Sequence, residues 1–447
     1  MNTEKLLNYI GQIDDDIIAE ADVHSIKTKS AKRTWLRAIS LTTVAAACLI
    51  VALPLMLKRL QAPEPVDFSA LPKLAVNSEF GGMGFEAHMA FHIDELRNNN
   101  PWTENNNLTT LPVFNNPLEY DKSGEPVDGL SPEEMLAKAE EIANLFGLEI
   151  TSLYTEPTPE QIEQITQKLE GAAASEEEIY QNTRVYRAIA ECKGANIDVW
   201  KNGNIILWLK PETADLVNDI GKLDVYDNFS VEFNFSYEIV NDIQYTTGFP
   251  LPKGYSFTYE NTSREHAMEI TEYLFSKYGA FTGIKTPEYN LFADYTYSAV
   301  LTRLQTSVFE NAGSLAERIL NFNFTNIHFN ASDAGGLGGI SYSKTDLSQK
   351  IGDYPIITAE EAKTLLLEKQ YITTVPEELP DAEYIARVEL VYRTSRRDSV
   401  FMPYYKFFVE MPTMQRENGL KTFGIFYVPA VKAEFLENTP IWDGSFN

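Results

Sequence analysis

The sequence predicts an α+β fold of tandem units, each a helical stretch followed by an antiparallel sheet, preceded by one transmembrane helix. Three observations support this prediction. Residues 38–57 form a run of 20 residues without a charge. Several helix starts carry capping-box residues, in which a Ser or Thr is followed three positions later by Glu or Gln. The stretches that follow these helices are rich in Val, Ile, Tyr and Phe, as strands are.

The uncharged run is long enough to cross a membrane. At about 1.5 Å per helical residue, 20 residues cover roughly 30 Å, the thickness of the hydrocarbon layer. A cleavable signal peptide is disfavoured because 37 residues precede the run. Basic residues gather before it rather than after it, which predicts a cytoplasmic amino terminus and an extracellular carboxyl-terminal domain. The residues that set this orientation are Lys27, Lys29, Lys32, Arg33 and Arg37, against Lys58 and Arg59.

The predicted cytoplasmic tail, residues 1–34, has the pattern of an amphipathic helix. Its apolar residues recur at three- and four-residue spacing: Leu6, Leu7, Ile10, Ile13, Ile17 and Ile18. So short a segment cannot build a core, so the apolar stripe is expected to meet a signalling protein, a second tail or the membrane surface. The acidic polar face disfavours the membrane surface, and docking to a cytosolic or membrane signalling protein is the favoured interpretation.

Charge and cysteine content limit what the outer part can bind. The chain has a net charge of −27, and residues 61–447 hold 29 basic against 58 acidic side chains. Such a surface repels polyanions, so nucleic acid is excluded as a direct partner. Only Cys192 lies beyond the predicted transmembrane helix (35–58), so no intramolecular disulfide is expected there, which suits a Gram-positive surface.

Local sequence signals divide the predicted outer part into a stalk and three units. A proline-rich stalk is predicted over residues 59–78, followed by α+β units over 79–220, 221–350 and 351–447, the divisions falling near 211–227 and 345–354. Asn202-Gly203 predicts a hairpin turn between two strands. Gly147 and Gly279 are expected to end helices in the left-handed conformation. The predicted capping boxes are Ser131 with Glu134, Thr158 with Gln161, Thr262 with Glu265, and Thr358 with Glu361.

No catalytic, cofactor or metal site is predicted. His88 and His92 lie in a strictly alternating stretch, and four residues apart on a strand they are about 13 Å from one another, too far to share an ion. Ser341 and Lys344 match a penicillin-recognition motif but lie in a strand-like run after glycine residues 335–339, which are expected to turn the chain back on residues 326–330.

Other candidates also favour structural roles. Residues 121–128 resemble a calcium loop without its essential positions, and Cys192 is expected to be buried. His266 is placed in the first turn of a helix and His328 in a strand, so no nucleophile and base can be paired. Residues distant in sequence could still converge.

Two segments resemble known families. Residues 356–362, 388–392, 403–407 and 427–430 resemble the closing unit of the YycH/YycI-type proteins. That resemblance implies a single-pass regulator that restrains a cell-wall sensor kinase in low-GC Gram-positive bacteria. Residues 4–18 look like the start of Firmicute membrane proteins placed among anti-sigma factors, although the tail lacks a Cys/His zinc motif. The partner implied is therefore either a sensor kinase or a sigma factor.

The favoured function is a non-enzymatic transmembrane signalling regulator, whose outer domain binds a ligand or an envelope protein. The alternative is a membrane-anchored envelope-binding or structural module, in which aromatic residues line a carbohydrate or peptide groove; core positions are the favoured interpretation for these residues. They are Trp200, Trp208, Tyr404 and Tyr405. An anchored hydrolase is the third possibility.

Overall fold

The computed structural model describes residues 68–77, 88–91, 98–121, 124–226, 228–235, 237–240, 243–246, 248–258, 262–295, 301–332, 334–373, 375–394, 398–414 and 421–444. They form an α+β fold, as predicted. None of the helices in these ranges is long and apolar enough to cross a membrane. The predicted tail and transmembrane helix, with all their named residues, lie outside the described residues.

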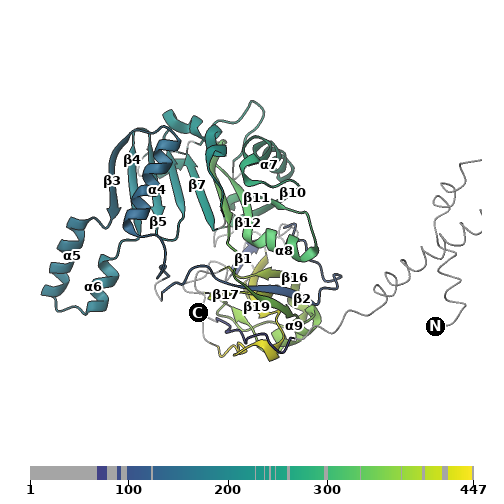
Figure 1. Cartoon of the computed structure of the whole chain (residues 1–447). Helices are drawn as coiled ribbons and strands as arrows, with labels where there is room; N and C mark the ends of the chain where they lie inside the picture. Colours follow the sequence, from purple (N-terminus) through teal and green to yellow (C-terminus); the bar gives the residue numbers. More distant parts are fainter. Residues whose placement is uncertain are drawn as a thin grey trace, which may run out of the picture. The chain divides into compact units, whose positions relative to one another are not determined.

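A nine-stranded sheet forms the first part of the fold (Figure 1). Its spatial order is β10-β11-β12-β13-β7-β6-β5-β4-β3. It therefore takes strands from the predicted ranges 79–220 and 221–350. The strands are β3 (Ile150–Glu156), β4 (Arg187–Cys192), β5 (Ala195–Trp200), β6 (Ile205–Leu209), β7 (Phe229–Phe235), β10 (Pro287–Tyr295), β11 (Leu301–Glu310), β12 (Thr325–Ala331) and β13 (Leu337–Lys344).

One pair in this sheet departs from the predicted antiparallel pattern. β6 and β7 are parallel because the 3-10 helix η2 (Pro211–Lys222) carries the chain across between them. Parallel neighbours need a crossover of about a dozen residues, which η2 provides. The predicted hairpin β5–β6 is confirmed, with Gly203 at φ 85° in its turn. The predicted return of residues 326–330 onto β13 is also confirmed.

Helices cover one face of this sheet. α4 (Pro132–Leu145) buries Met135 and Ala139 against strands β3, β4 and β5. α7 (Arg264–Tyr278), followed by the 3-10 helix η3 (Gly279–Thr282), packs on β10 and β11, and its buried residues join the same core. The short hairpin of β8 (Tyr237–Val240) and β9 (Ile243–Thr246) stands apart as its own sheet.

A five-stranded sheet forms the second part. β1 (His88–Phe91), β19 (Lys421–Pro429), β18 (Pro403–Glu410) and β16 (Ile385–Tyr392) are its main strands, and β15 (Ile372–Thr373) pairs with β19. One face packs on α8 (Leu315–Phe324) and α9 (Ala359–Leu367). β2 (Thr110–Asn115), β14 (Lys350–Pro355) and β17 (Val400–Phe401) form a three-stranded sheet. The 3-10 turns are η4 (Ala382–Tyr384), η5 (Pro412–Met414) and η6 (Ala433–Phe435).

The described end of the predicted stalk, residues 68–77, packs into this second part. Leu74 and Val76 are only 2% and 4% exposed. The amide of Val76 donates to Asn438 Oδ1 over 2.8 Å, and Asn438 Nδ2 donates to the Val76 carbonyl over 2.9 Å. The chain that follows the predicted transmembrane helix is thus held by the C-terminal residues of the fold.

Most predicted helix signals are confirmed. The capping boxes at Ser131, Thr158 and Thr358 form as expected. The box at Thr262 is wrong by one residue: Ser263 caps α7, because the Thr262 hydroxyl accepts from the Thr258 amide instead. Gly147 adopts φ 67° after α4, as predicted.

The expectation for Gly279 is wrong in conformation. Its φ is −79°, because the chain continues into η3 and turns left-handed at Gly283, where φ is 75°.

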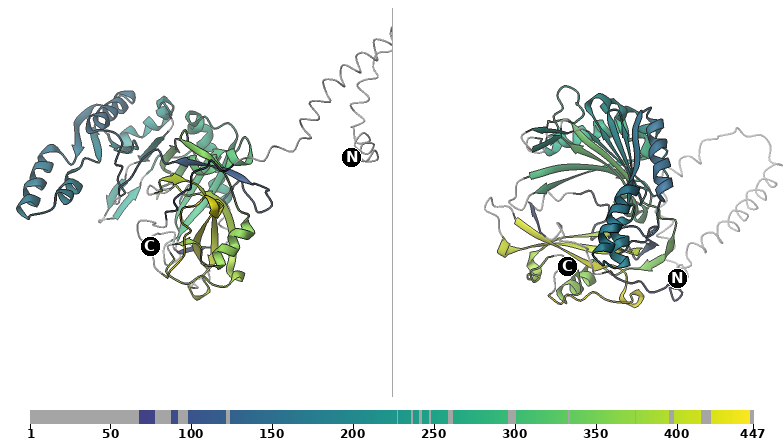
Figure 2. Two further views of the ribbon diagram at one scale, coloured as in Figure 1. Left: turned by 60° about the horizontal axis from the view of Figure 1, so that its bottom comes forward. Right: turned by 90° about the vertical axis from the view of Figure 1, so that its left-hand side faces the viewer.

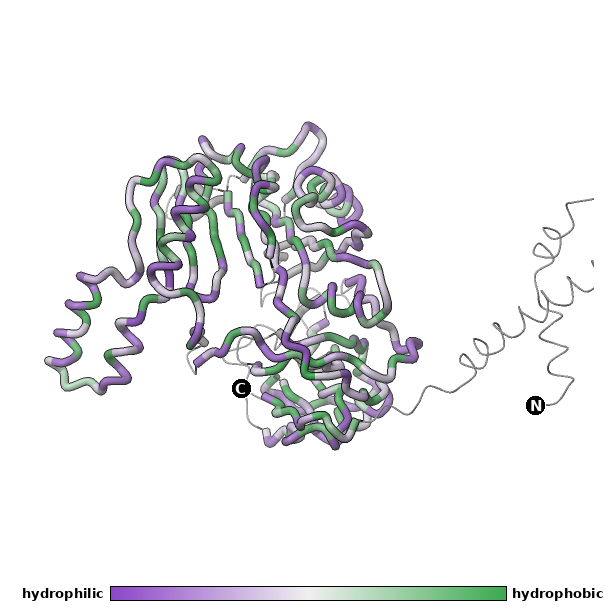
Figure 3. The backbone as a smooth tube through the Cα atoms, in the orientation of Figure 1, coloured by the Kyte–Doolittle hydropathy of each residue, from purple (hydrophilic) through white to green (hydrophobic). Residues whose placement is uncertain are grey.

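A helical hairpin is inserted in the chain between the neighbouring strands β3 and β4. α5 (Pro159–Gly171) and α6 (Glu176–Thr183) contain no fully buried residue. The hairpin extends beyond the end of β3, as Figure 1 and the left view of Figure 2 show. Hydrophilic and hydrophobic residues alternate along both helices in Figure 3, so each helix has an amphipathic pattern. We call α5 and α6 the helical arm.

Candidate functional site

The face of the nine-stranded sheet opposite α4 carries the candidate site, and we call it the open face. Residues that alternate with the core positions of β3–β6 point to this side, because successive side chains of a strand point to opposite faces. At β11 and β12, α8 covers the open face, where the rings of Phe309 and Phe322 lie 5.3 Å apart. At β3–β6 no described helix packs on it.

The strand register aligns nine residues across the whole sheet on this face, seven of them polar and two of them isoleucine. Each is directly opposite the next on its neighbouring strand: Asn290, Ser307, His328, Ser341, Glu232, Ile206, Asp198, Ile189 and Tyr154. We call this line the polar row. Both ends of the row include buried residues: Asn290 and Ser307 are 6% and 5% exposed at the α8 end, and Asp198 and Ile189 are 6% and 8% exposed near β3. We call the β3–β6 end of the row, where α8 does not cover the sheet, its open end.

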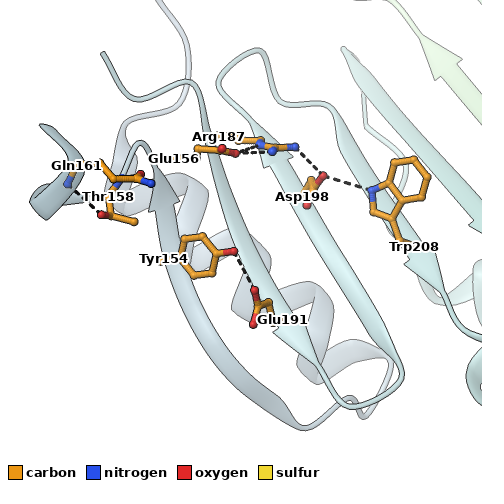
Figure 4. Close-up of polar contacts among 8 residues, drawn as sticks. All are labelled: Tyr154, Glu156, Thr158, Gln161, Arg187, Glu191, Asp198 and Trp208. Carbon is orange, nitrogen blue, oxygen red and sulfur yellow. Dashed lines mark hydrogen bonds and ion pairs between the residues drawn. The ribbon is translucent and has the colours of Figure 1, made fainter. Parts of the chain in front are cut away.

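An arginine joins two carboxylates at the open end of the row (Figure 4). Arg187 Nε donates to Glu156 Oε2 over 2.5 Å, and Arg187 Nη1 donates to Asp198 Oδ2 over 3.1 Å. Trp208 Nε1 donates to the same Asp198 oxygen over 3.3 Å. We call these four residues the Arg187 cluster. The side chains of the cluster come from β3, β4, β5 and β6 and link these four strands.

Burial and charge act in opposite directions on this cluster. Asp198 is 6% exposed, and burial raises the pKa of its carboxyl group, although Arg187 and the Trp208 N–H oppose that shift. Burial would lower the pKa of Arg187, but the hydrogen bond with Glu156 and the charge of Asp198 outweigh it and raise the pKa. Both carboxylates are bound to the guanidinium, so the cluster is a network of charge-assisted hydrogen bonds.

Aromatic rings surround the guanidinium. The Arg187 Cζ atom lies 5.2 Å from the ring centre of Trp200 and 5.8 Å from that of Tyr186, within the range of cation–π attraction. Nearby, Tyr154 donates to Glu191 over 2.9 Å, and this hydrogen bond raises the pKa of the phenol. Trp208 remains 39% exposed, so part of its indole surface is open while its N–H is held by Asp198.

A pocket of about 290 Å³ lies where the helical arm leaves the sheet. Its polar groups are mostly side-chain amides, together with one carboxylate and one phenol, and they come from the end of β3, the arm and the start of β4. The pocket is lined by Glu156, Pro157, Gln161, Gln164, Ile165, Asn182 and Tyr186. It therefore continues the polar surface of the Arg187 cluster.

The aromatic residues that the sequence singled out have separate positions. Tyr404 and Tyr405 are core residues, 3% and 2% exposed, as favoured above. Trp200 is half-buried and Trp208 is exposed, both on the open face. The predicted aromatic groove is thus not assembled from all four residues.

The structure brings two of the histidine and serine candidates together: His328 in β12 lies directly opposite Ser341 in β13. His88 lies in β1, which confirms the predicted strand, and His92 lies outside the described residues. Ser341 and Lys344 lie in β13, also as predicted. Cys192 is buried and reduced. Among the described residues there is no cluster of three metal-ligating side chains.

Sequence reasoning missed Glu156, Arg187 and Asp198, because each stands alone in its own strand. A signal was present in β5, where Asn196 and Asp198 alternate with Ile197 and Val199. That alternation predicts a polar face, but it does not tell which strands lie side by side. The crossover at η2 and the insertion of the helical arm decide that.

Comparisons with known proteins give no relative for this chain. No protein-family model, no curated protein and no solved structure matches it.

Proposed function

We propose that the chain is a non-enzymatic transmembrane signalling regulator, anti-sigma-like or associated with a sensor kinase, whose outer domain binds a ligand or protein at the open face. The observation that carries this proposal is the open end of the polar row. There, a sheet face lacks a helical cover, and its charged groups are fixed by Arg187. A rigid, solvated and partly aromatic surface is typical of a recognition site.

The tail supplies the cytoplasmic part of the proposed signalling path. The apolar stripe from Leu6 to Ile18 has no core of its own and sits before a predicted transmembrane helix with a basic cytoplasmic flank. Binding outside the membrane and docking inside it are the two halves of a signal relay. In this proposed relay, the chain that follows the predicted transmembrane helix leads into the buried residues Leu74 and Val76.

A tail deletion tests this proposal. Removing residues 5–21 is expected to abolish the regulated output, and immobilised residues 1–34 are expected to capture a sigma factor or a sensor kinase. A phosphatase fused after Leu60 is expected to be active outside the cell. A fusion active only inside would contradict the topology, and a tail deletion without effect would contradict the regulator.

Trp208 favours the second candidate, a membrane-anchored envelope-binding module. An indole that is 39% exposed beside a fixed carboxylate can hold the apolar side of a sugar ring or a peptide side chain. This candidate needs no cytoplasmic partner. It is favoured if Trp208→Ala weakens attachment to isolated cell envelopes while the tail deletion changes nothing.

A further inference from the structure

The nine-stranded sheet ends at β3, which is one of its two edge strands. No described strand pairs with it on its outer side. The register with β4 shifts between Ile150 and Ser152, so the regular run is residues 152–156. An unpaired edge presents a row of N–H and C=O groups that can accept another strand.

Two other edge strands, β10 and β16, are contacted by one asparagine-rich segment. Asn99 Nδ2 donates to the carbonyl of Tyr289 in β10 over 2.6 Å. Asn100 Nδ2 donates to the carbonyl of Leu390 in β16 over 3.2 Å. Side chains thus occupy carbonyls of both edge strands, whereas β3 receives no such cover from the described residues. β3 therefore differs from the edge strands β10 and β16.

The register shift between Ile150 and Ser152 is one feature that can blunt an exposed edge, but the regular run of β3 carries few others. Its residues, Ile-Thr-Ser-Leu-Tyr-Thr-Glu, include no Lys and no internal Pro, and several have high β-propensity. Leu153 is 37% exposed on the α4 side, opposite Ala190. Tyr154 points to the open face, opposite Ile189. An added strand would therefore meet an apolar side chain on one face and the polar row on the other.

The charge of the surface around β3 favours a particular composition in the added strand. Glu156 ends β3, and Glu191 lies beside Tyr154 on the open face. The helical arm, which begins two residues after Glu156 with the cap at Thr158, adds more acidic than basic side chains: Glu160, Glu163, Glu170, Glu176, Glu177 and Glu178 against Lys168. Arg184 and Arg187 are both bound to carboxylates. The surface around the edge is thus acidic and attracts a basic partner.

We infer that the edge of β3 binds an extended peptide with alternating apolar and basic residues, by strand addition. Backbone hydrogen bonds to residues 152–156 supply the affinity, and the alternating side chains supply the choice of partner. Apolar residues of the peptide pack on Leu153, while its basic residues face Glu156, Glu191 and the acidic arm. The inference rests on the proposed role of the outer domain as a binding module, and it names the class of partner.

A matched set of synthetic peptides tests this inference on the full-length chain in mild detergent. The probe is a fluorescent eight-residue peptide of alternating Val and Lys, and its binding is followed by anisotropy. One control alternates Val and Glu, and a second has the Val and Lys residues in separate blocks. A further pair carries N-methyl groups on alternate residues, one peptide for each register, which removes the hydrogen-bond donors without changing charge.

The Val-Lys peptide is expected to bind, and one N-methylated register is expected to bind at least roughly tenfold more weakly. Leu153→Lys is expected to weaken binding by a similar factor, because it adds a charge to the edge. Leu367→Lys is the matched control, since Leu367 is 43% exposed on α9 and should leave binding unchanged.

Equal binding of both N-methylated registers and the parent peptide would overturn strand addition and leave only a charge attraction. A dimer that Leu153→Lys dissociates, seen by sedimentation, would overturn it in favour of a second copy at this edge. Failure of the peptide to bind would also overturn it. None of these results changes the outcome of the tail deletion, so the inference and the proposed function can fail separately.

Discussion

His328 gives the most quantitative prediction, because its protonation is tied to folding. It lies in β12 as part of the polar row, between Ser307 and Ser341. Burial lowers its pKa from 6.5 to about 4. In the unfolded chain the imidazole takes up a proton near pH 6.5, whereas in the folded protein it stays neutral until about pH 4.

The sign and size of the effect follow from this difference. Between pH 6.5 and 4 the unfolded chain binds the extra proton, so the free energy of unfolding falls as the pH falls. The shift corresponds to a loss of about 3 kcal/mol by pH 4. This is an upper value, because the residue is half-buried rather than fully enclosed. Above pH 6.5 the histidine is neutral in both the folded and the unfolded chain, so it does not make the free energy of unfolding depend on pH.

Chemical denaturation at a series of pH values measures this contribution. Other groups also titrate in this range, so the informative quantity is the difference between the wild-type protein and His328→Gln. That difference is expected to shrink as the pH is lowered from 6.5 to 4. His266→Gln is the control and should keep the wild-type dependence, because His328 is intact. Parallel curves for wild type and His328→Gln would refute the reasoning.

Three further predictions concern the stability of single contacts. Asn438→Ala removes both hydrogen bonds to Val76 and should lower the free energy of unfolding by about 1–3 kcal/mol, while Thr439→Ala should not. Gly338→Ala would place a Cβ 2.4 Å from the Ala331 carbonyl oxygen and should cost roughly 1–3 kcal/mol, whereas Gly171→Ala meets nothing within 4 Å and should cost nothing measurable. Ser314→Ala removes the cap of α8 and should cost about 1 kcal/mol. Denaturant midpoints measure all three, and an unchanged midpoint in Asn438→Ala, Gly338→Ala or Ser314→Ala would contradict the contact assigned to that residue.

Local features of the fold could be predicted from the sequence because their causes are local. Ser131 and Glu134 close a capping box within one turn, and Asn202-Gly203 fixes a hairpin within four residues. Polar and apolar residues alternate along β5, which marks its two faces. In each case the stabilising contact joins residues close in sequence.

Features set by distant contacts could not be predicted. Glu156 meets Arg187 only because the helical arm, residues 159–183, is inserted between their strands. β6 and β7 run parallel because η2 crosses over, although the composition of both strands suits either direction. Prolines before Leu74 predict a stalk, yet the apolar residues of this segment meet Leu436 and Phe435 at the other end of the chain. Sequence patterning alone carries no information on such pairings.

Transcript profiling tests the proposed regulator most directly. Three strains are compared with wild type, carrying a deletion of residues 5–21, Arg187→Ala, and Leu367→Lys as a surface control. The deletion and Arg187→Ala are expected to alter a shared set of transcripts, because one removes the docking helix and the other disrupts the recognition surface, while Leu367→Lys alters none of them. Unchanged transcripts in the tail deletion, or two unrelated sets in the deletion and Arg187→Ala, would contradict a signal passing from the open face to the tail.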